Sequence, residues 1–144
     1  MTTATQYRVT VGNIGEVYAG NNATEARATF NTYKAQSLAN EGRAGAEPVT
    51  LWEHGEPSKE FAPVVYDLEL TDTFAGETNY SWVKRATLVY TFEPSDRTIV
   101  TDAKRALGLT GIKCTRDDWP DTGATIQLDP RGLCQRAFIT RRDV

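Results

Sequence analysis

Side chains suited to nucleophilic or metal chemistry are scarce in this chain of 144 residues, which holds one histidine and two cysteines. His54 lies beside Gly55 in the segment WEHGEPS, where we predict a turn. Cys114 and Cys134 could use only this histidine as a base, and the sequence contains no Gly-x-Ser-x-Gly elbow. One histidine and two distant cysteines are too few ligands for a structural zinc site. The residue types lean against an enzyme, a metal site and a cofactor, and they predict two buried, unpaired thiols.

Glycine-rich segments could instead bind an anion through backbone N–H groups. Gly12 and Gly15 in VGNIG lack a helix directly after them, which a dinucleotide-binding fingerprint requires, so we predict a tight hairpin turn there. A second segment, EGRAGAEP, places Gly42 and Gly45 on either side of Arg43. Its guanidinium could hold an anion against a backbone nest. The alternative for this segment is a helix C-cap followed by a surface loop.

Carboxylates and tryptophans form the third group of candidates. Asp117, Asp118 and Asp121 lie close together around Trp119 in the segment TRDDWPDTGA. Acids at this density can bind Mg²⁺ or Ca²⁺, but their spacing is not that of an EF-hand loop, and we predict an acidic turn. A tryptophan beside charged groups is typical of an interface. The residues that we predict to bind a partner are Glu47, Trp52, Glu53, Glu56, Asp117, Asp118, Trp119 and Asp121.

Charge and hydropathy limit the classes of partner. The net charge is −3, so a large basic surface for nucleic acid is not expected. Residues 95–144 are mildly basic, with nine Lys and Arg against seven Asp and Glu. They leave open a DNA-binding alternative through Arg136, Arg141 and Arg142. No apolar stretch approaches the roughly 20 residues that span a bilayer, and no secretory signal is visible, so we expect a cytoplasmic protein without a membrane partner.

The first half of the chain has the pattern of two hairpins separated by a helix. Tyr7, Val9 and Val11 alternate with polar residues, as in a half-buried strand, and EVYAG forms the return strand. A helix is predicted from the cap Asn22 through the segment NNATEARATFNTYKAQSLANEG. A second hairpin follows in EPVTLWEHGEPSKEF. Residues 1–62 are therefore predicted to be a ββαββ unit.

The second half repeats this layout with one more strand. The segments VVYDLELTDTF and YSWVKRATLVYTF are predicted strands, and the helix SDRTIVTDAKRALG follows, capped by Ser95 and Gly108. Three short strands come next: TGIKCT, ATIQL and CQRAFIT. Residues 63–144 are predicted to be a ββαβββ unit. The fold class is α+β, with two small antiparallel sheets that each carry one packed helix, as separate units or as one fused domain.

Four segments extend through much of the chain: VGNIGEVYAG, GRAGAEPVTL, LTDTFAGETNYSWVKR and AKRALGLTGIKC. In them the chain resembles small proteins encoded by phages and other mobile elements of bacteria, a group that includes anti-CRISPR and other anti-defence inhibitors. The resemblance implies a small, non-enzymatic, often acidic protein that occupies a surface of a host complex. It assigns no catalytic residue.

These observations favour a protein-binding inhibitor or adaptor in the bacterial cytoplasm. Its acidic surface would meet a basic, nucleic-acid-binding surface of a host defence complex. Two alternatives stay open: a protein that binds a nucleotide or small anion through Arg43, and a DNA-binding module that uses the arginines near the C-terminus. Exposed strand edges leave room for a homodimer.

Overall fold

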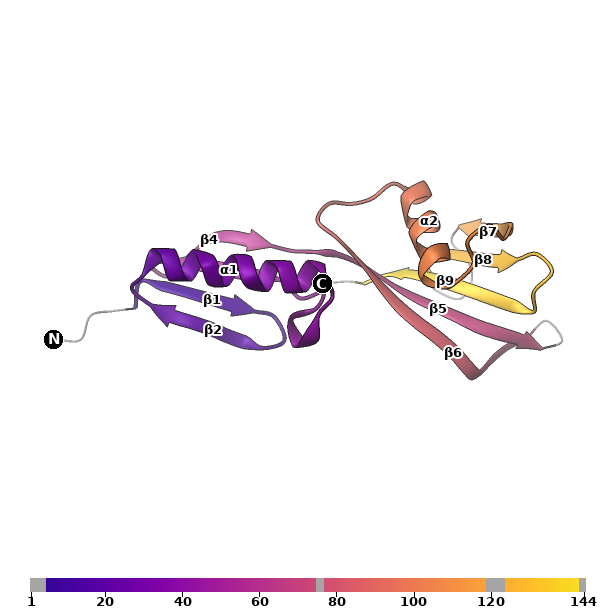
Figure 1. Ribbon diagram of the computed structural model, residues 1–144, viewed down its shortest axis with the longest axis horizontal. Coiled ribbons are helices and arrows are strands. Elements are labelled where there is room, and N and C mark those ends of the chain that lie inside the picture. The colour runs from indigo at the N-terminus through magenta and orange to yellow at the C-terminus, as the bar shows by residue number, and fades with distance from the viewer. Residues whose placement is uncertain (1–4, 75–76, 119–123, 143–144) are drawn as a thin grey trace. The chain divides into compact units, whose positions relative to one another are not determined.

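The computed structural model describes residues 5–74, 77–118 and 124–142. It shows an α+β protein with two antiparallel sheets, of four and five strands, and two α-helices (Figure 1). The element order is ββαββ followed by ββαβββ. The predicted fold class is therefore confirmed.

Contacts within the chain divide it into two compact units. The N-terminal unit consists of Met1–Pro63 with Val89–Phe92, and the C-terminal unit consists of Val64–Leu88 with Glu93–Val144. The sequence pattern predicts a boundary after residue 62 and carries no signal for the return of 89–92 to the N-terminal unit. Each unit is described by itself below.

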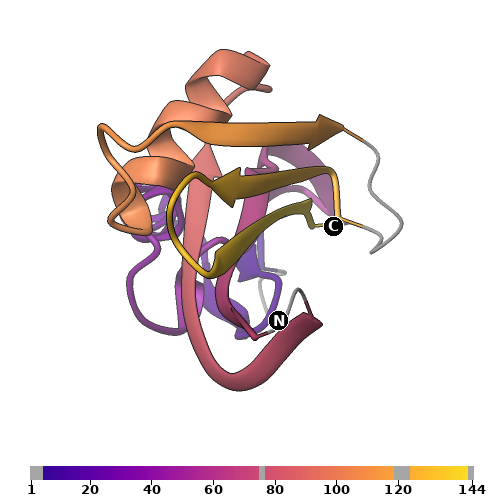
Figure 2. The same ribbon diagram turned by 90° about the vertical axis from the view of Figure 1, so that its right-hand side faces the viewer.

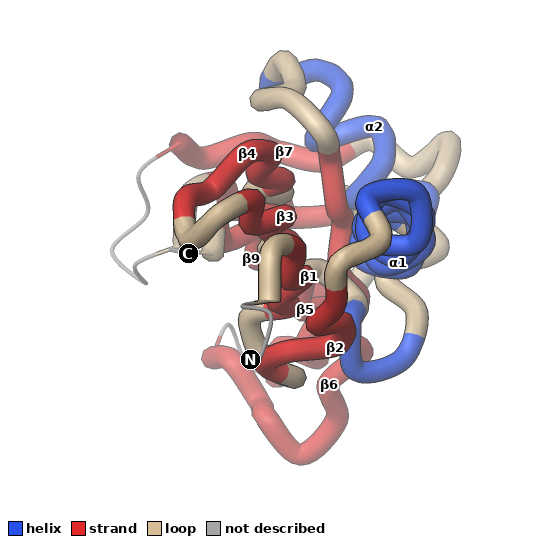
Figure 3. Tube along the Cα trace, turned by 90° about the vertical axis from the view of Figure 1, so that its left-hand side faces the viewer, coloured by secondary structure: helices blue, strands red, loops and turns tan. Residues whose placement is uncertain are grey.

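The N-terminal unit has a four-stranded sheet in the order β2-β1-β3-β4, with every neighbouring pair antiparallel. One helix covers one face of this sheet, as the view along α1 shows (Figure 3). The elements are β1 (Tyr7–Val11), β2 (Gly15–Gly20), α1 (Ala23–Leu38), the short 3₁₀ helix η1 (Gly42–Ala44), β3 (Val49–Glu53) and β4 (Glu56–Phe61).

The core of this unit lies between the sheet and α1. Val9 on β1 and Leu51 on β3 are fully buried and directly opposite each other, and α1 contributes Ala26 and Phe30. The predicted alternation in β1 is thus what turns its apolar side chains toward the helix. Ser37, rather than Leu38, completes the inward face of α1, because its hydroxyl donates to the carbonyl of Glu47 at 2.6 Å.

Two tight turns have the predicted backbone geometry. Gly15, at the end of the β1–β2 turn, has a φ of +93°. His54 and Gly55 between β3 and β4 have φ values of +54° and +83°, as a two-residue type I′ hairpin requires. The histidine that the sequence offered for chemistry is therefore a turn residue.

The N-cap of α1 gives a prediction of stability. The side chain of Asn22 accepts hydrogen bonds from the N–H groups of Thr24 and Glu25, at 3.0 and 3.2 Å. We expect Asn22→Ala to lower the free energy of unfolding of this unit by about 0.5–2 kcal/mol, because two helix donors lose their acceptor. Urea unfolding followed by circular dichroism measures this. The control Asn31→Ala, at an exposed position within α1, should be neutral or slightly stabilising; equal losses in both variants would contradict a capping role.

The C-terminal unit has a five-stranded sheet in the order β6-β5-β9-β8-β7. The three strands that follow α2 in the chain lie next to one another and form one side of this sheet (Figure 2). The elements are β5 (Val64–Phe74), β6 (Glu77–Tyr90), α2 (Asp96–Ala106), β7 (Cys114–Asp118), β8 (Ile126–Pro130) and β9 (Gln135–Arg141).

The helix α2 is bounded as the sequence predicted. The Ser95 hydroxyl accepts from the N–H of Thr98 at its start. At its end the N–H of Leu109 donates to the carbonyl of Lys104 at 2.7 Å, and Gly108 has a φ of +75°, a Schellman arrangement. Ile99 and Ala103 on α2 are buried, as are Val65, Leu68 and Leu70 on β5, Ile126 and Leu128 on β8, and Ala137, Phe138 and Ile139 on β9.

Two predictions about the last third of the chain were wrong. Asp117 and Asp118 lie in the strand β7 and not in a turn, because β7 is an edge strand whose polar side chains lack the alternation that marks a half-buried strand. Cys134 is exposed in the β8–β9 turn and not buried, whereas Cys114 is half-buried on β7; both are free thiols.

Candidate functional site

Trp52 lies on the face of the N-terminal sheet that α1 does not cover. Its neighbour Leu51 points toward the helix, so strand alternation turns Trp52 to the opposite face. The indole Nε1 donates a hydrogen bond of 2.9 Å to the hydroxyl of Thr10 on β1. Trp52 is half-buried, so part of this large aromatic side chain contacts solvent.

The register of the strands identifies the side chains around this tryptophan. Arg8 is directly opposite Trp52, and Glu16 on β2 is opposite Thr10. Arg8 donates to the Glu16 carboxylate from both Nε and Nη2, at 3.0 and 2.7 Å. We name this surface the open sheet face, and its residues are Arg8, Thr10, Glu16, Thr50, Trp52 and Glu60. All six are exposed or half-buried.

The other predicted partner-binding residues of this unit lie elsewhere. Glu53 forms an ion pair of 3.9 Å with Arg27 of α1, so it faces the helix side of the sheet. Glu56 is opposite Glu53 across the β3–β4 hairpin and shares that side. Glu47 precedes β3 and lies beside Gly12, where a Cβ would approach its carboxylate to 2.8 Å. The structure thus brings Glu53 and Glu56 together but separates both from Trp52.

The predicted acidic group near residue 118 belongs to the C-terminal unit. Asp117 and Asp118 are exposed on the edge strand β7. Asp118 and Asp96 of α2 hold the Arg116 guanidinium between them, at 2.7 and 3.0 Å, beside a surface hollow of about 140 Å³. These two carboxylates raise the pKa of Arg116 above its ordinary value, most strongly through the hydrogen bond from Asp118. Trp119 and Asp121 lie outside the described residues.

Local packing and hydrogen bonds explain the conformation of the loop that was predicted to bind an anion. Gly42 has a φ of +59°, and Gly45 lies so close to Asn40 that a Cβ would meet its backbone at 2.8 Å. The N–H of Gly45 donates to the carbonyl of Gly42, and the Arg43 carbonyl accepts from the Asn13 side chain. The Arg43 side chain is exposed. Backbone geometry and close packing therefore explain why glycine occupies both positions, and no bound ligand is needed for this explanation.

The three arginines of the DNA-binding alternative each pair with a carboxylate. Arg136 binds Asp129 at 2.7 Å, Arg141 binds Glu93 at 3.0 Å, and Arg142 binds Asp67 at 2.6 Å. Such pairs lower the positive charge that is available to phosphates. This arrangement gives the DNA-binding alternative no support.

Sequence reasoning missed most of the open sheet face. The alternation of β1 predicts that Arg8 and Thr10 lie on the other face of this strand from Val9. The sequence does not show that β1 pairs with β3 rather than with β4. A bulge in the β1–β2 pair also shifts the register, so that Glu16 faces Thr10 while the neighbouring Val17 and Tyr18 both pack against the core. The signal that could have found this face was the alternation of β3, which places Trp52 on the side of Arg8.

Comparisons with protein-family models, with curated proteins and with solved structures found no match to this chain. Among the described residues, no three His, Cys, Asp or Glu side chains are grouped so that they could hold a metal ion. Nor does this part of the chain contain a helix of the length and apolarity needed to cross a membrane.

Proposed function

We propose that this protein is a non-enzymatic inhibitor or adaptor that binds another protein through the open sheet face. The observation that carries the proposal is Trp52, whose ring is fixed by Thr10 on a sheet face that the helix of its unit leaves uncovered. Tryptophan is enriched among the residues that dominate binding energy, and a ring that is already fixed loses little entropy on binding.

The charges of this unit favour a basic partner. Residues 1–62 carry five Lys and Arg against seven Asp and Glu. On the open sheet face, Glu16 is paired with Arg8, and Glu60 lies opposite Thr50 without an ion pair among those found in the described part of the chain. Acidic groups around an aromatic anchor attract a positively charged surface and orient it. The partner that fits this chemistry is a nucleic-acid-binding surface of a protein complex.

The resemblance to small phage and mobile-element proteins supports a narrower version of this function. Known anti-defence inhibitors of that group act by occupying a surface on a host complex. We infer by this analogy that the partner belongs to a bacterial defence complex. The open sheet face would then compete with nucleic acid for that partner.

A capture experiment with matched variants tests the proposal. We expect the tagged protein to retain a basic partner from a bacterial lysate that carries defence systems, and Trp52→Ala to weaken the purified interaction by about 30-fold or more. Trp52→Phe keeps an aromatic ring in place if alanine perturbs the fold. The control Leu38→Ala changes an exposed side chain on α1 and should leave binding unchanged.

Two results would contradict the proposal. One is a partner that binds the wild-type protein and Trp52→Ala equally well while both remain folded by circular dichroism. The other is a partner whose binding is insensitive to salt and which does not bind nucleic acid, because an acidic face should compete with nucleic acid and weaken as salt screens its charge.

A further inference from the structure

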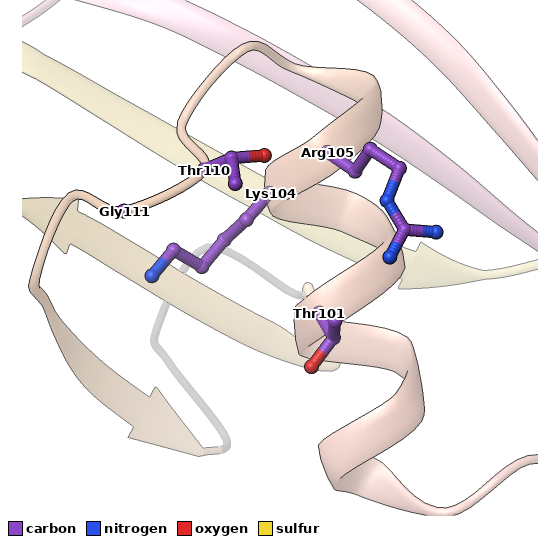
Figure 4. Close-up of a pocket in the computed structure, with 5 residues that line it drawn as sticks. All are labelled: Thr101, Lys104, Arg105, Thr110 and Gly111. Atoms are coloured by element: carbon purple, nitrogen blue, oxygen red, sulfur yellow. The ribbon is translucent and has the colours of Figure 1, made fainter.

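The C-terminal end of α2 borders a pocket that the proposed function does not use. The pocket has a volume of about 130 Å³ and is lined by Thr101, Lys104, Arg105, Thr110 and Gly111 (Figure 4). Two residues with cationic side chains and two threonines therefore border one small hollow, and the Lys104 amine and the Arg105 guanidinium extend from it in different directions (Figure 4). All five residues belong to the C-terminal unit.

The helix and the turn after it bring these side chains together. Thr101, Lys104 and Arg105 have the i, i+3, i+4 spacing that places side chains on one side of a helix. The chain then reverses at Gly108, and buried Leu107 and Leu109 fix the reversal to the core. Thr110 and Gly111 follow directly and form the opposite side of the pocket. The site is thus held by packed backbone on both sides.

The partial negative charge at the carboxyl end of a helix would by itself disfavour an anion here. Two features reduce this partial negative charge. The carbonyls of Lys104 and Arg105 already accept hydrogen bonds from Leu109 and Gly108, at 2.7 and 3.3 Å. Lys84 of β6 also reaches this end of the helix, with its Nζ 3.7 Å from the position of a Cβ on Gly108.

The cations at the pocket exceed their carboxylate partners. Asp102 contacts Arg105 with 3.6 Å between Oδ1 and Nη1, and 73% of the Arg105 side chain stays exposed. Within the described part of the chain, no ion pair is found for Lys104, which is half-buried. An exposed pair of this kind is weak, so the guanidinium can turn to a competing anion at small cost.

We propose that this pocket binds a phosphate group, either free or at the end of a nucleotide. A phosphate monoester carries nearly two negative charges and three terminal oxygens, which would match the Lys104 amine, the two threonine hydroxyls and the Arg105 guanidinium once that exposed side chain turns toward the hollow. The volume of about 130 Å³ is well below the roughly 300 Å³ at which pockets for whole drug-sized ligands begin. That is enough for a phosphate group and too small for a whole nucleotide, whose remainder would lie outside in solvent.

Titration of the ¹⁵N-labelled full chain, followed by NMR, tests this site. Inorganic phosphate and AMP are added separately, with sodium chloride at matched ionic strength as the blank. We expect saturable shifts of the amide signals of Thr110, Gly111 and Arg105 with phosphate and with AMP. Equal affinities assign the site to phosphate alone, and tighter binding of AMP with further shifts assigns it to a nucleotide.

Variants connect these shifts to the side chains. Lys104→Gln combined with Arg105→Gln should weaken phosphate binding at least about tenfold, because two charged donors are lost. The control Lys59→Gln with Arg43→Gln removes the same charges from exposed positions of the N-terminal unit, one of them the anion candidate of the sequence, and should leave affinity unchanged. Absence of saturable shifts at Thr110 and Gly111 would overturn the proposal, as would equal weakening in both double variants.

Discussion

Replacing Leu51 with alanine should lower the free energy of unfolding of the N-terminal unit by about 2–5 kcal/mol. Leu51 is fully buried in the central strand β3, between Val9 of β1 and Lys59 of β4, on the face that packs against α1. The substitution removes apolar contacts and leaves a cavity that sheet and helix cannot easily close. The unit is small, so a loss of this size is a large fraction of the stability of an ordinary domain.

Native-state hydrogen exchange is the appropriate measurement, because it resolves the two units. In Leu51→Ala the slow amides of Val9 and Val11 should exchange at least about 30-fold faster than in wild type, whereas those of β8 in the C-terminal unit should change little. The control Leu38→Ala makes the same substitution at a side chain that is 40% exposed, and its effect should stay below about 1 kcal/mol. Uniform acceleration in both units would show that they unfold as one and would contradict the assignment of this effect to a single core.

The sequence was informative where one residue pattern had one structural solution. The alternation of Val9 and Val11 specified a half-buried strand, and Asn22 specified the start of α1. His54 and Gly55 specified a two-residue turn because both adopt positive φ. In each case the chemistry of neighbouring residues in the chain determines the local structure, so no knowledge of distant contacts is required.

Contacts between residues that are distant in the chain determine the features that the sequence did not predict. Tyr66 of β5 is buried in phase with Leu68 and Leu70, and its hydroxyl donates to Glu93, which lies 27 residues further along the chain. A strand was predicted at TGIKCT, but β7 runs from Cys114 to Asp118, and its extension over the two aspartates was missed because an edge strand can be polar on both faces.

The candidate sites show the same division. Trp52 was predicted as an anchor from its residue type, but the side chains that share its face depend on the pairing of β1 with β3 and on a bulge in β2. The phosphate pocket depends on the reversal at Gly108, which brings Thr110 back to the side chains of α2. Both sites join residues whose proximity arises only after the elements have packed.

The environment of Tyr66 predicts a loss of stability at alkaline pH. Burial, followed by the hydrogen bond to Glu93 and by the charge of that carboxylate, raises the pKa of Tyr66 from 10.0 to about 12. Arg141, whose Nη2 lies 3.0 Å from Glu93 Oε2, opposes this shift through its charge and a side-chain hydrogen bond. The neutral phenol is therefore favoured in the folded protein over the unfolded chain.

The direction of the pH effect follows from this difference. Because the pKa is higher in the folded state, the contribution to stability is fully present below pH 10 and is lost as pH rises from 10 to about 12. Two pKa units correspond to roughly 2–3 kcal/mol. The loss should fall on the C-terminal unit, in which Tyr66, Glu93 and Arg141 all lie.

Comparison of the wild-type protein with Tyr66→Phe isolates this residue from the other groups that titrate at alkaline pH. Urea unfolding followed by circular dichroism at pH 9 and pH 11.5 should show a larger loss of stability in the wild type than in Tyr66→Phe. The difference spectrum near 295 nm should show one tyrosine that ionises near pH 12. Glu93→Gln should reduce the pH effect without abolishing it, because burial is the largest cause of the raised pKa and remains in that variant. Equal losses in the wild type and Tyr66→Phe would show that the Tyr66 phenol does not determine the alkaline limit of this unit.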